Sequence, residues 1–252
     1  MLKLQMSSTR TATTTDWDEI DFEFLGNVTG QPWILQTNIF TGGKGDREQR
    51  IFLWFDPTAR FHTYSILWTT QQIVYVPSCQ PKHGVNMSIN IKSNDHFGHV
   101  RKRILTLTMH IKLCRCFVCR WYVDNVPIRI YRNTPTTSAT YPKWKPMAVY
   151  GSVWNGDSWA TRGGLDKINF AYAPFVVSYN KFYIDACKFG QASTPPACYT
   201  NPSPYWWANY ALTSTEKKLY TLYTKTYTIY NYCNDYPNRF PVQPPECKDA
   251  PW

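Results

Sequence analysis

Acidic and apolar residues alternate along residues 19–24, and this pattern constrains the fold more than any other feature of the chain. Glu19, Asp21 and Glu23 occupy every second position, and the positions between them are Ile or Phe. Side chains of a β-strand point alternately to its two faces, so the pattern predicts a strand with acids on one face. Like charges along one face disfavour a strand, which indicates a function for them. A merely exposed acidic face is the alternative.

Other β-like runs follow at short spacing, separated by turn signals such as Gly42-Gly43 and Asp56-Pro57. The predicted strands cover residues 33–40, 50–55, 63–75, 121–131, 147–154 and 175–185. Residues 213–227 lack Gly and Pro, and they form the one long helix that we expect. Many strands without alternating helices predict an all-β fold with two antiparallel sheets packed as a sandwich.

Residues 76–120 differ in composition from the rest of the chain. They hold eight Lys or Arg and one acid, which is +7 of the total net charge of +10, and four of the five histidines. Because the rest of the chain carries only +3, this distribution does not favour a nucleic-acid partner. Residues 72–75 and 121–128 read as two parts of one strand and its turn. We therefore interpret 76–120 as a foreign insert such as a retained intron, which sequencing of the spliced transcript tests.

The same stretch contains residue types that suit zinc, and this is an alternative interpretation of it. These residues are Cys114, Cys116 and Cys119 with His96, His99 or His110. The C-x-C-x-x-C spacing lacks a second regular pair, so we predict no metal site. We also predict no membrane span, since no window approaches the roughly 20 apolar residues of a membrane helix.

Three acids on one strand face suit glycoside hydrolysis with retention, which needs one carboxylate as nucleophile and one carboxyl group as proton donor. The backbones of Glu19 and Glu23 lie about 13 Å apart on a straight strand. Strand curvature and leaning side chains must bring the carboxyl groups to about 5–5.5 Å. Asp21 lies between them, and three neighbouring carboxylates cannot all ionise cheaply, so one of them is expected to keep a proton.

Residues 17–27 (WDEIDFEFLGN) resemble the signature of xyloglucan endotransglucosylase/hydrolases, a group within glycoside hydrolase family 16. The resemblance continues in segments 36–38 (QTN), 42–48 (GGKGDRE), 53–57 (LWFDP), 123–129 (VDNVPIR), 159–164 (WATRGG) and 230–233 (YNYC). It implies a concanavalin-like β-jelly-roll sandwich with a C-terminal extension. It also implies that Glu19 is the nucleophile, Glu23 the general acid/base and Asp21 a helper of its neighbours.

The resemblance further implies a set of substrate-binding residues. These are Gln36, Thr37, Asn38, Asp46, Arg47, Glu48, Ser158, Trp159, Gly163 and Arg239. Amides and charged groups bond sugar hydroxyls, and the Trp159 ring offers an apolar face to a pyranose, although a lone Trp is also a common core residue. The family usually has Asp where this chain has Ser158, so one polar contact is expected to differ.

Several further expectations come from the resemblance. It implies an N-glycan at Asn27 in the sequon Asn27-Val28-Thr29, and disulfides Cys187–Cys198 and Cys233–Cys247. It divides the chain into a catalytic domain at 16–175, interrupted by 76–120, and a C-terminal extension at 176–249. Family members begin with a signal peptide and further strands, so we expect this chain to be an N-terminally truncated copy of a secreted, apoplastic and cell-wall enzyme.

The implied reaction cuts the β-1,4-glucan backbone of xyloglucan and rejoins it to a xyloglucan oligosaccharide, with no cofactor. The implied partners are the donor and acceptor glycans, without nucleic acid or membrane, and we expect a monomer. The alternative is a catalytically inert or misfolded family member, because lost strands would expose apolar faces and unpaired sheet edges.

Overall fold

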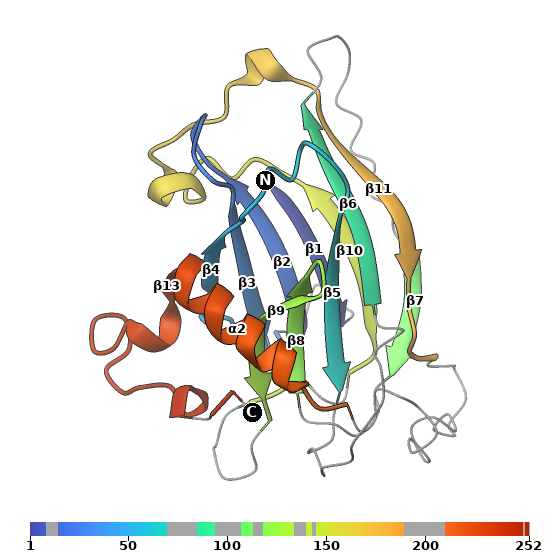
Figure 1. Ribbon diagram of the computed structural model, residues 1–252, viewed down its shortest axis with the longest axis vertical. Helices are drawn as coiled ribbons and strands as arrows, with labels where there is room; N and C mark the ends of the chain where they lie inside the picture. Colours follow the sequence, from blue (N-terminus) through green and yellow to red (C-terminus); the bar gives the residue numbers. More distant parts are fainter. Residues whose placement is uncertain are drawn as a thin grey trace.

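The computed structural model describes residues 1–8, 15–69, 85–93, 107–112, 118–133, 140–142, 145–188, 210–248 and 250–251. These residues form two antiparallel β-sheets packed face to face, with one long helix and several 3-10 turns around them (Figure 1). The predicted all-β sandwich is therefore confirmed.

Eight of the described strands form the larger sheet, and five form the smaller one. The spatial order in the larger sheet is β12 (Cys187–Lys188), β7 (Leu107–Lys112), β10 (Met147–Val153), β1 (Leu2–Ser8), β2 (Glu19–Gly26), β3 (Ile34–Phe40), β4 (Gln49–Phe52) and β13 (Thr228–Asn231). The order in the smaller sheet is β11 (Phe175–Tyr183), β6 (Val85–Ser93), β5 (His62–Thr69), β8 (Val118–Val123) and β9 (Val126–Arg132).

The hydrophobic core lies between the two sheets, because the apolar positions of each alternating strand face inward. Phe22 and Phe24 of β2 pack edge-on against Tyr64 of β5, and the Trp121 ring of β8 is fully buried beside them. Burial of each large aromatic ring contributes about 2–3 kcal/mol. This apolar face of β2 directs the alternate residues, the acids, to the opposite face of the larger sheet.

The predicted strands are present, with some changes at their ends. The range predicted at 121–131 is two strands, β8 and β9, because Asp124 and Asn125 adopt φ angles of 47° and 65° in a two-residue hairpin turn. Strand β5 is described to Thr69, and residues 70–75 of that prediction lie outside the described residues. Strands β1, β12 and β13 were not predicted. Strands β12 and β13 have only two and four residues, and such short runs carry a weak pattern, whereas the alternation in the seven residues of β1 was overlooked.

Two strands of the sandwich come from the compositionally different stretch 76–120. Strand β6 pairs with β5 and β11, and β7 pairs with β10 and β12. Strand β8 begins at Val118, so Cys119 and Arg120 are buried residues of the smaller sheet. The predicted boundary at residue 120 therefore falls inside a core strand.

The helix predicted at 213–227 is confirmed as α2 (Ser214–Tyr227). A capping box begins it: the Thr213 hydroxyl accepts from the Glu216 N–H, and the Glu216 carboxylate accepts from the Thr213 N–H. Its Tyr223 ring packs 4.5 Å from the ring of Trp54. Within the described ranges, neither α2 nor any shorter helix has the length and apolar composition to cross a membrane.

The described residues also form short 3-10 helices outside the strands. They are η1 (Thr161–Gly164), η2 (Phe170–Tyr172), η4 (Tyr232–Asn234) and η5 (Pro245–Lys248).

Candidate active site

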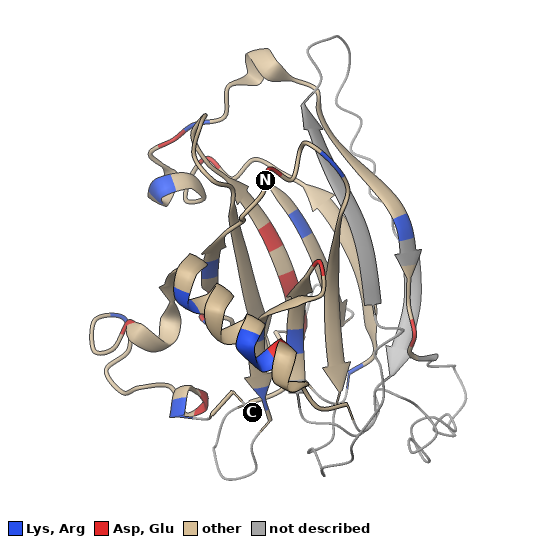
Figure 2. Ribbon diagram, in the orientation of Figure 1, with Lys and Arg blue, Asp and Glu red and all other residues tan. Residues whose placement is uncertain are grey.

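Strand β2 presents three acidic side chains on one face of the larger sheet. Glu19, Asp21 and Glu23 alternate with core residues, as predicted, and they are 2%, 0% and 6% exposed. Figure 2 shows acidic positions of β2 in the middle of the sheet, beside a basic position of β1. The one cation of β1 is Lys3, which pairs with Glu23. We call the three acidic side chains the carboxyl row.

The carboxyl row converges on the ammonium nitrogen of Lys3. Lys3 Nζ lies 2.5 Å from Glu19 Oε1, 3.0 Å from Asp21 Oδ2 and 3.1 Å from Glu23 Oε1. Because these contacts share one atom, the Glu19 and Glu23 oxygens cannot be more than 5.6 Å apart. This limit is close to the carboxyl separation of about 5–5.5 Å that retaining glycoside hydrolysis requires.

Neighbouring strands hold the first two acids in place. Gln5 Nε2 on β1 donates to Glu19 Oε2 at 2.9 Å, and the backbone N–H of Asn38 on β3 donates to Asp21 Oδ1 at 2.8 Å. From the smaller sheet, Trp121 Nε1 donates to the backbone carbonyl of Asp21 at 3.0 Å. The middle of the carboxyl row is therefore tied to both layers of the sandwich.

A hydrogen-bonded relay leads from Glu23 across β3 to β4. Gln36 Nε2 donates to Glu23 Oε2, and Arg50 Nε donates to Gln36 Oε1 at 2.7 Å. The Arg50 guanidinium lies over the ring of Tyr230, 5.3 Å from its centroid. The relay orients the Gln36 amide, because its oxygen is occupied by the arginine and only its NH₂ group can face the carboxyl group.

The middle acid has a strongly perturbed protonation equilibrium. Full burial raises the pKa of Asp21 well above its ordinary value, and the nearby Glu23 and Glu19 raise it further, whereas Lys3 lowers it. This matches the expectation that one acid of the row keeps a proton. A protonated Asp21 reduces the repulsion within the row.

The raised pKa of Asp21 predicts how stability depends on pH. Below the unfolded-state pKa near 3.8 both states hold the proton, and above it only the folded state does. The free energy of unfolding should therefore fall by up to about 1.4 kcal/mol per pH unit until the folded pKa is reached. Asp21→Asn cannot titrate, so urea unfolding of both proteins from pH 4 to 7 should show the wild type losing stability relative to the variant. Parallel curves would contradict a raised pKa.

Two of the predicted substrate-binding residues flank the carboxyl row, and one lies on the other face. Gln36 and Asn38 pair with Glu23 and Asp21 on the same side of the sheet. Thr37, between them, points into the core, where its Oγ1 accepts from Arg129 Nη1 at 2.8 Å. Strand alternation separates Thr37 from the row, so its place is that of a structural partner of a buried arginine.

Three other predicted residues form one charged group near β4 and β13. Arg239 Nη2 lies 2.6 Å from Asp46 Oδ1, and Arg239 Nη1 lies 2.7 Å from Glu48 Oε2. The Tyr230 hydroxyl accepts from Arg239 Nη1 at 3.0 Å. Tyr230 also stacks with Arg50, so this group is linked to the relay that ends at Glu23.

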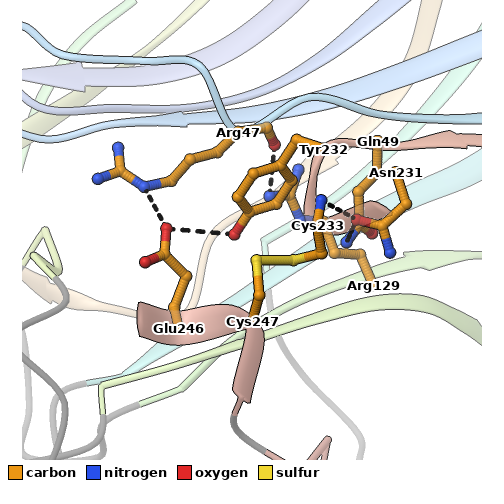
Figure 3. Close-up of a disulfide and its surroundings, with 8 residues drawn as sticks. All are labelled: Arg47, Gln49, Arg129, Asn231, Tyr232, Cys233, Glu246 and Cys247. Atoms are coloured by element: carbon orange, nitrogen blue, oxygen red, sulfur yellow. Dashed lines mark hydrogen bonds and ion pairs between the residues drawn. A yellow bond between two sulfur atoms is a disulfide. The ribbon is translucent and has the colours of Figure 1, made fainter. Parts of the chain in front are cut away.

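Arg47, also predicted to bind substrate, is bonded to the C-terminal segment. Its Nε donates to Glu246 Oε1 at 2.9 Å, and Glu246 also accepts from the Tyr232 hydroxyl at 3.3 Å (Figure 3). The disulfide Cys233–Cys247 lies beside these contacts, and its predicted pairing is confirmed. The cross-link joins the two ends of the segment 233–247. The neighbouring residues Tyr232 and Glu246 contact Glu48 and Arg47 in the loop that precedes β4.

Removal of this disulfide is expected to lower the free energy of unfolding by a measurable amount. The bond closes a loop with a sequence separation of 14, for which loop entropy contributes about 3 kcal/mol. The double variant Cys233→Ser/Cys247→Ser should unfold at correspondingly lower urea concentration under oxidising conditions. With a strong reductant, the two proteins should unfold together. A gap that survives reduction would show that the serines, and not the lost cross-link, cause the difference.

The predicted residues Ser158, Trp159 and Gly163 lie on the loop that ends in η1. This loop is fastened to the end of β2 by a bond of 3.0 Å from the Thr161 hydroxyl to the Leu25 carbonyl. The Trp159 side chain is exposed, as a sugar-stacking ring requires. Gly163 has φ 69°, a backbone conformation that favours glycine.

The remaining predicted sites have different outcomes. Asn27 lies in the turn after β2, and its side-chain NH₂ donates to the Pro32 carbonyl at 2.8 Å. Cys198 lies outside the described residues, as do the side chains of Cys187 and His110, whose backbones belong to β12 and β7. All but one of the other cysteines and histidines considered for zinc also lie outside them. The exception, Cys119, is fully buried in β8, and burial raises the pKa of its thiol well above its ordinary value.

Sequence reasoning missed two charged groups near the carboxyl row, Lys3 and Arg50. A signal existed for Lys3, because Lys3 and Gln5 alternate with Leu2, Leu4 and Met6 in the same period-two pattern as the acids. Recognising β1 would have placed Lys3 on one face of a strand, but not beside Glu23. That neighbour relation depends on the pairing register of β1 with β2.

Two sequence profiles match the chain. The profile described as "Glycosyl hydrolases family 16" matches residues 4–100 and 118–172, and "Xyloglucan endo-transglycosylase (XET) C-terminus" matches residues 201–247. An antiparallel β-sandwich with a row of acids on one strand is the architecture of a class of glycoside hydrolases. The chain belongs to glycosyl hydrolases family 16.

Similar proteins come from several plants. The chain is 41% identical over 237 residues to "Xyloglucan endotransglucosylase protein 2" of Diospyros kaki, covering 93% of this chain and 63% of that protein. It is 41% identical over 240 residues to "Xyloglucan endotransglucosylase/hydrolase" of Brassica oleracea var. botrytis, covering 94% and 64%. It is also 41% identical over 237 residues to "Probable xyloglucan endotransglucosylase/hydrolase protein 5" of Arabidopsis thaliana, covering 93% and 64%. The chain thus spans slightly less than two thirds of the length of these relatives.

Proposed function

We propose that this chain cleaves the β-1,4-glucan backbone of xyloglucan and rejoins it to a second xyloglucan end, by a retaining double displacement. The observation that supports this most directly is the limit of 5.6 Å between the Glu19 and Glu23 oxygens. A separation at or below this limit excludes the larger gap of about 6.5–9.5 Å that inverting enzymes need for a water molecule, and it supports one anomeric carbon being reached by both glutamates.

The proposed roles follow from the chemistry of two carboxyl groups. A Glu19 oxygen attacks the anomeric carbon while Glu23 gives its proton to the leaving glycosidic oxygen, which forms a glycosyl ester and releases one glycan end. Glu23, now a carboxylate, removes the proton from the acceptor hydroxyl. The acceptor oxygen then bonds to the anomeric carbon and the Glu19 ester bond breaks. Asp21 assists by keeping a proton between the two glutamates.

The proposed binding surface combines the groups that surround the carboxyl row. Gln36 and Asn38 lie beside the acids, and the group around Arg239 lies beyond β4. We further propose that Trp159 stacks on a sugar ring of the bound glycan. The names of the relatives support xyloglucan as the glycan. We also propose xyloglucan oligosaccharides as acceptors and action in the plant apoplast and cell wall.

The test is transfer from xyloglucan to a fluorescent xyloglucan oligosaccharide, followed by size-exclusion chromatography. Transfer moves label into the polymer fraction, whereas hydrolysis alone shortens the polymer without labelling it. The same assay on a chain without residues 76–120 tests whether that stretch is foreign: equal or higher transfer would support the interpretation. If a folded protein shows no transfer and does not shorten the polymer, the proposed function is refuted.

A further inference from the structure

The Lys3 side chain has no role in the proposed reaction, although it touches every member of the carboxyl row. Its ammonium group lies within 3.1 Å of an oxygen of each acid, and its side chain is only 15% exposed. A retaining mechanism uses two carboxyl groups and no cation between them. The position of this lysine therefore needs a separate explanation.

The surroundings of Lys3 favour its protonated, positively charged form. Burial works against the ammonium form, but the attraction of Asp21, Glu23 and Glu19 outweighs burial and raises the pKa of Lys3 above its ordinary value. Phe40 offers a further favourable contact, with Lys3 Nζ 5.6 Å from its ring centroid. The group is thus a permanent cation at any pH at which the enzyme would work.

The backbone of β1 holds Lys3 over the row. Leu2 and Leu4, on either side of it, are each 3% exposed in the core between the sheets. Strand β1 also pairs along its length with β2 and β10. The backbone cannot withdraw without opening the sheet, so only rotation of the lysine side chain can remove the ammonium from the carboxyl groups.

The ammonium group occupies the place that the reaction centre needs. Lys3 Nζ is 2.5 Å from Glu19 Oε1, whereas an anomeric carbon must come to about 3–3.5 Å of the attacking oxygen. The same cation is 3.1 Å from Glu23 Oε1, where a proton donor must meet the glycosidic oxygen. Nucleophile and donor are therefore both engaged with Lys3 before any glycan binds.

We propose that Lys3 is an internal inhibitory counter-ion, which a glycan must displace from Glu19 and Glu23 before reaction. The inference rests on the proposed function and adds to it an inhibitory contact between Lys3 and the two glutamates, which we call the brake. It requires kcat/KM for transfer to rise when the cation is removed, which is the opposite of what loss of a structural lysine would cause.

The experiment compares the wild type with Lys3→Met, which keeps the length and apolar stem of the side chain and removes its charge. We expect kcat/KM for xyloglucan transfer to rise by at least about tenfold, because the glycan no longer has to displace an ammonium group from Glu19 and Glu23. Lys3→Arg, which keeps the charge, should not exceed the wild type. Lys218→Met removes an exposed lysine of α2 and should stay within about twofold of the wild type. Lys3→Gln is a neutral second variant in case Lys3→Met does not fold.

The outcomes separate the inference from the proposed function. A gain in every neutral variant that folds, with folding checked by circular dichroism, supports the brake. Transfer by the neutral variants at or below the wild-type rate overturns the brake and leaves the proposed function standing. Absence of transfer from all folded forms refutes the proposed function and the brake with it.

Discussion

Replacement of Glu19 by glutamine is expected to reduce xyloglucan transfer on the order of 10⁴-fold or more. The amide keeps the shape of the side chain and can still accept from Gln5, but it cannot form the glycosyl ester that splits the reaction into two steps. Initial rates of label transfer and the mass of acid-quenched protein measure the effect. The wild type should show a covalent glycosyl adduct, and Glu19→Gln should not.

A matched control distinguishes loss of the nucleophile from the effect of removing one negative charge anywhere on the protein. Asp56→Asn changes an exposed acid in a surface turn, where the new amide oxygen can still accept from the Thr58 N–H. This variant should transfer within about twofold of the wild type. Rapid transfer by a folded Glu19→Gln protein would assign the nucleophile to another group.

Replacement of Glu23 by alanine is expected to reduce transfer from natural xyloglucan by about 10²–10⁴-fold, because the leaving oxygen loses its proton donor. An aryl glycoside of a xyloglucan oligosaccharide should still form the glycosyl ester, since a phenolate leaves without protonation. Azide needs no general base and fits the space left by the side chain. It should therefore accelerate turnover of the aryl donor by Glu23→Ala and yield a glycosyl azide of retained configuration.

The azide experiment has an internal control in the nucleophile variant. Glu19→Gln forms no ester, so azide should leave its turnover unchanged. Azide rescue of Glu19→Gln and not of Glu23→Ala would reverse the two proposed roles. An azide product of inverted configuration from Glu23→Ala would show direct attack by azide at the anomeric carbon, which contradicts a glycosyl ester on Glu19 in this variant.

The arrangement of the site relates its chemistry to the stability of the sandwich. Asp21 is held by a backbone N–H of β3 and supports, through its own carbonyl, an indole N–H from the smaller sheet. The buried Arg129 extends this link, since it donates to Thr37 on β3 and, at 2.6 Å, to the backbone carbonyl of Arg47. Changes in the core behind β2 should therefore reach the carboxyl row through the positions of β2 and β3.

Much of the fold was predictable because its signals are local. Alternation placed the three acids on one face, and the absence of Gly and Pro over 213–227 indicated the helix. Prediction failed at short elements and at turns, and it also assigned no strand to β1 or to β6 and β7 in the stretch 76–120. The sequence Asp124-Asn125 has the residue types of a two-residue hairpin, but the apolar runs on both sides of it suggested one continuous strand.

The sequence by itself determined which residues share a face of β2, because strand periodicity is a property of the backbone. It also contained the residues of the disulfide pair Cys233–Cys247. Only the tertiary structure decided which side chains meet the acids: Lys3 and Gln5 from β1, Gln36 and Asn38 from β3. These contacts depend on the pairing of strands that are distant in the chain. A shift of one residue in the register of β1 against β2 would turn Lys3 into the core and place a leucine over the carboxyl groups.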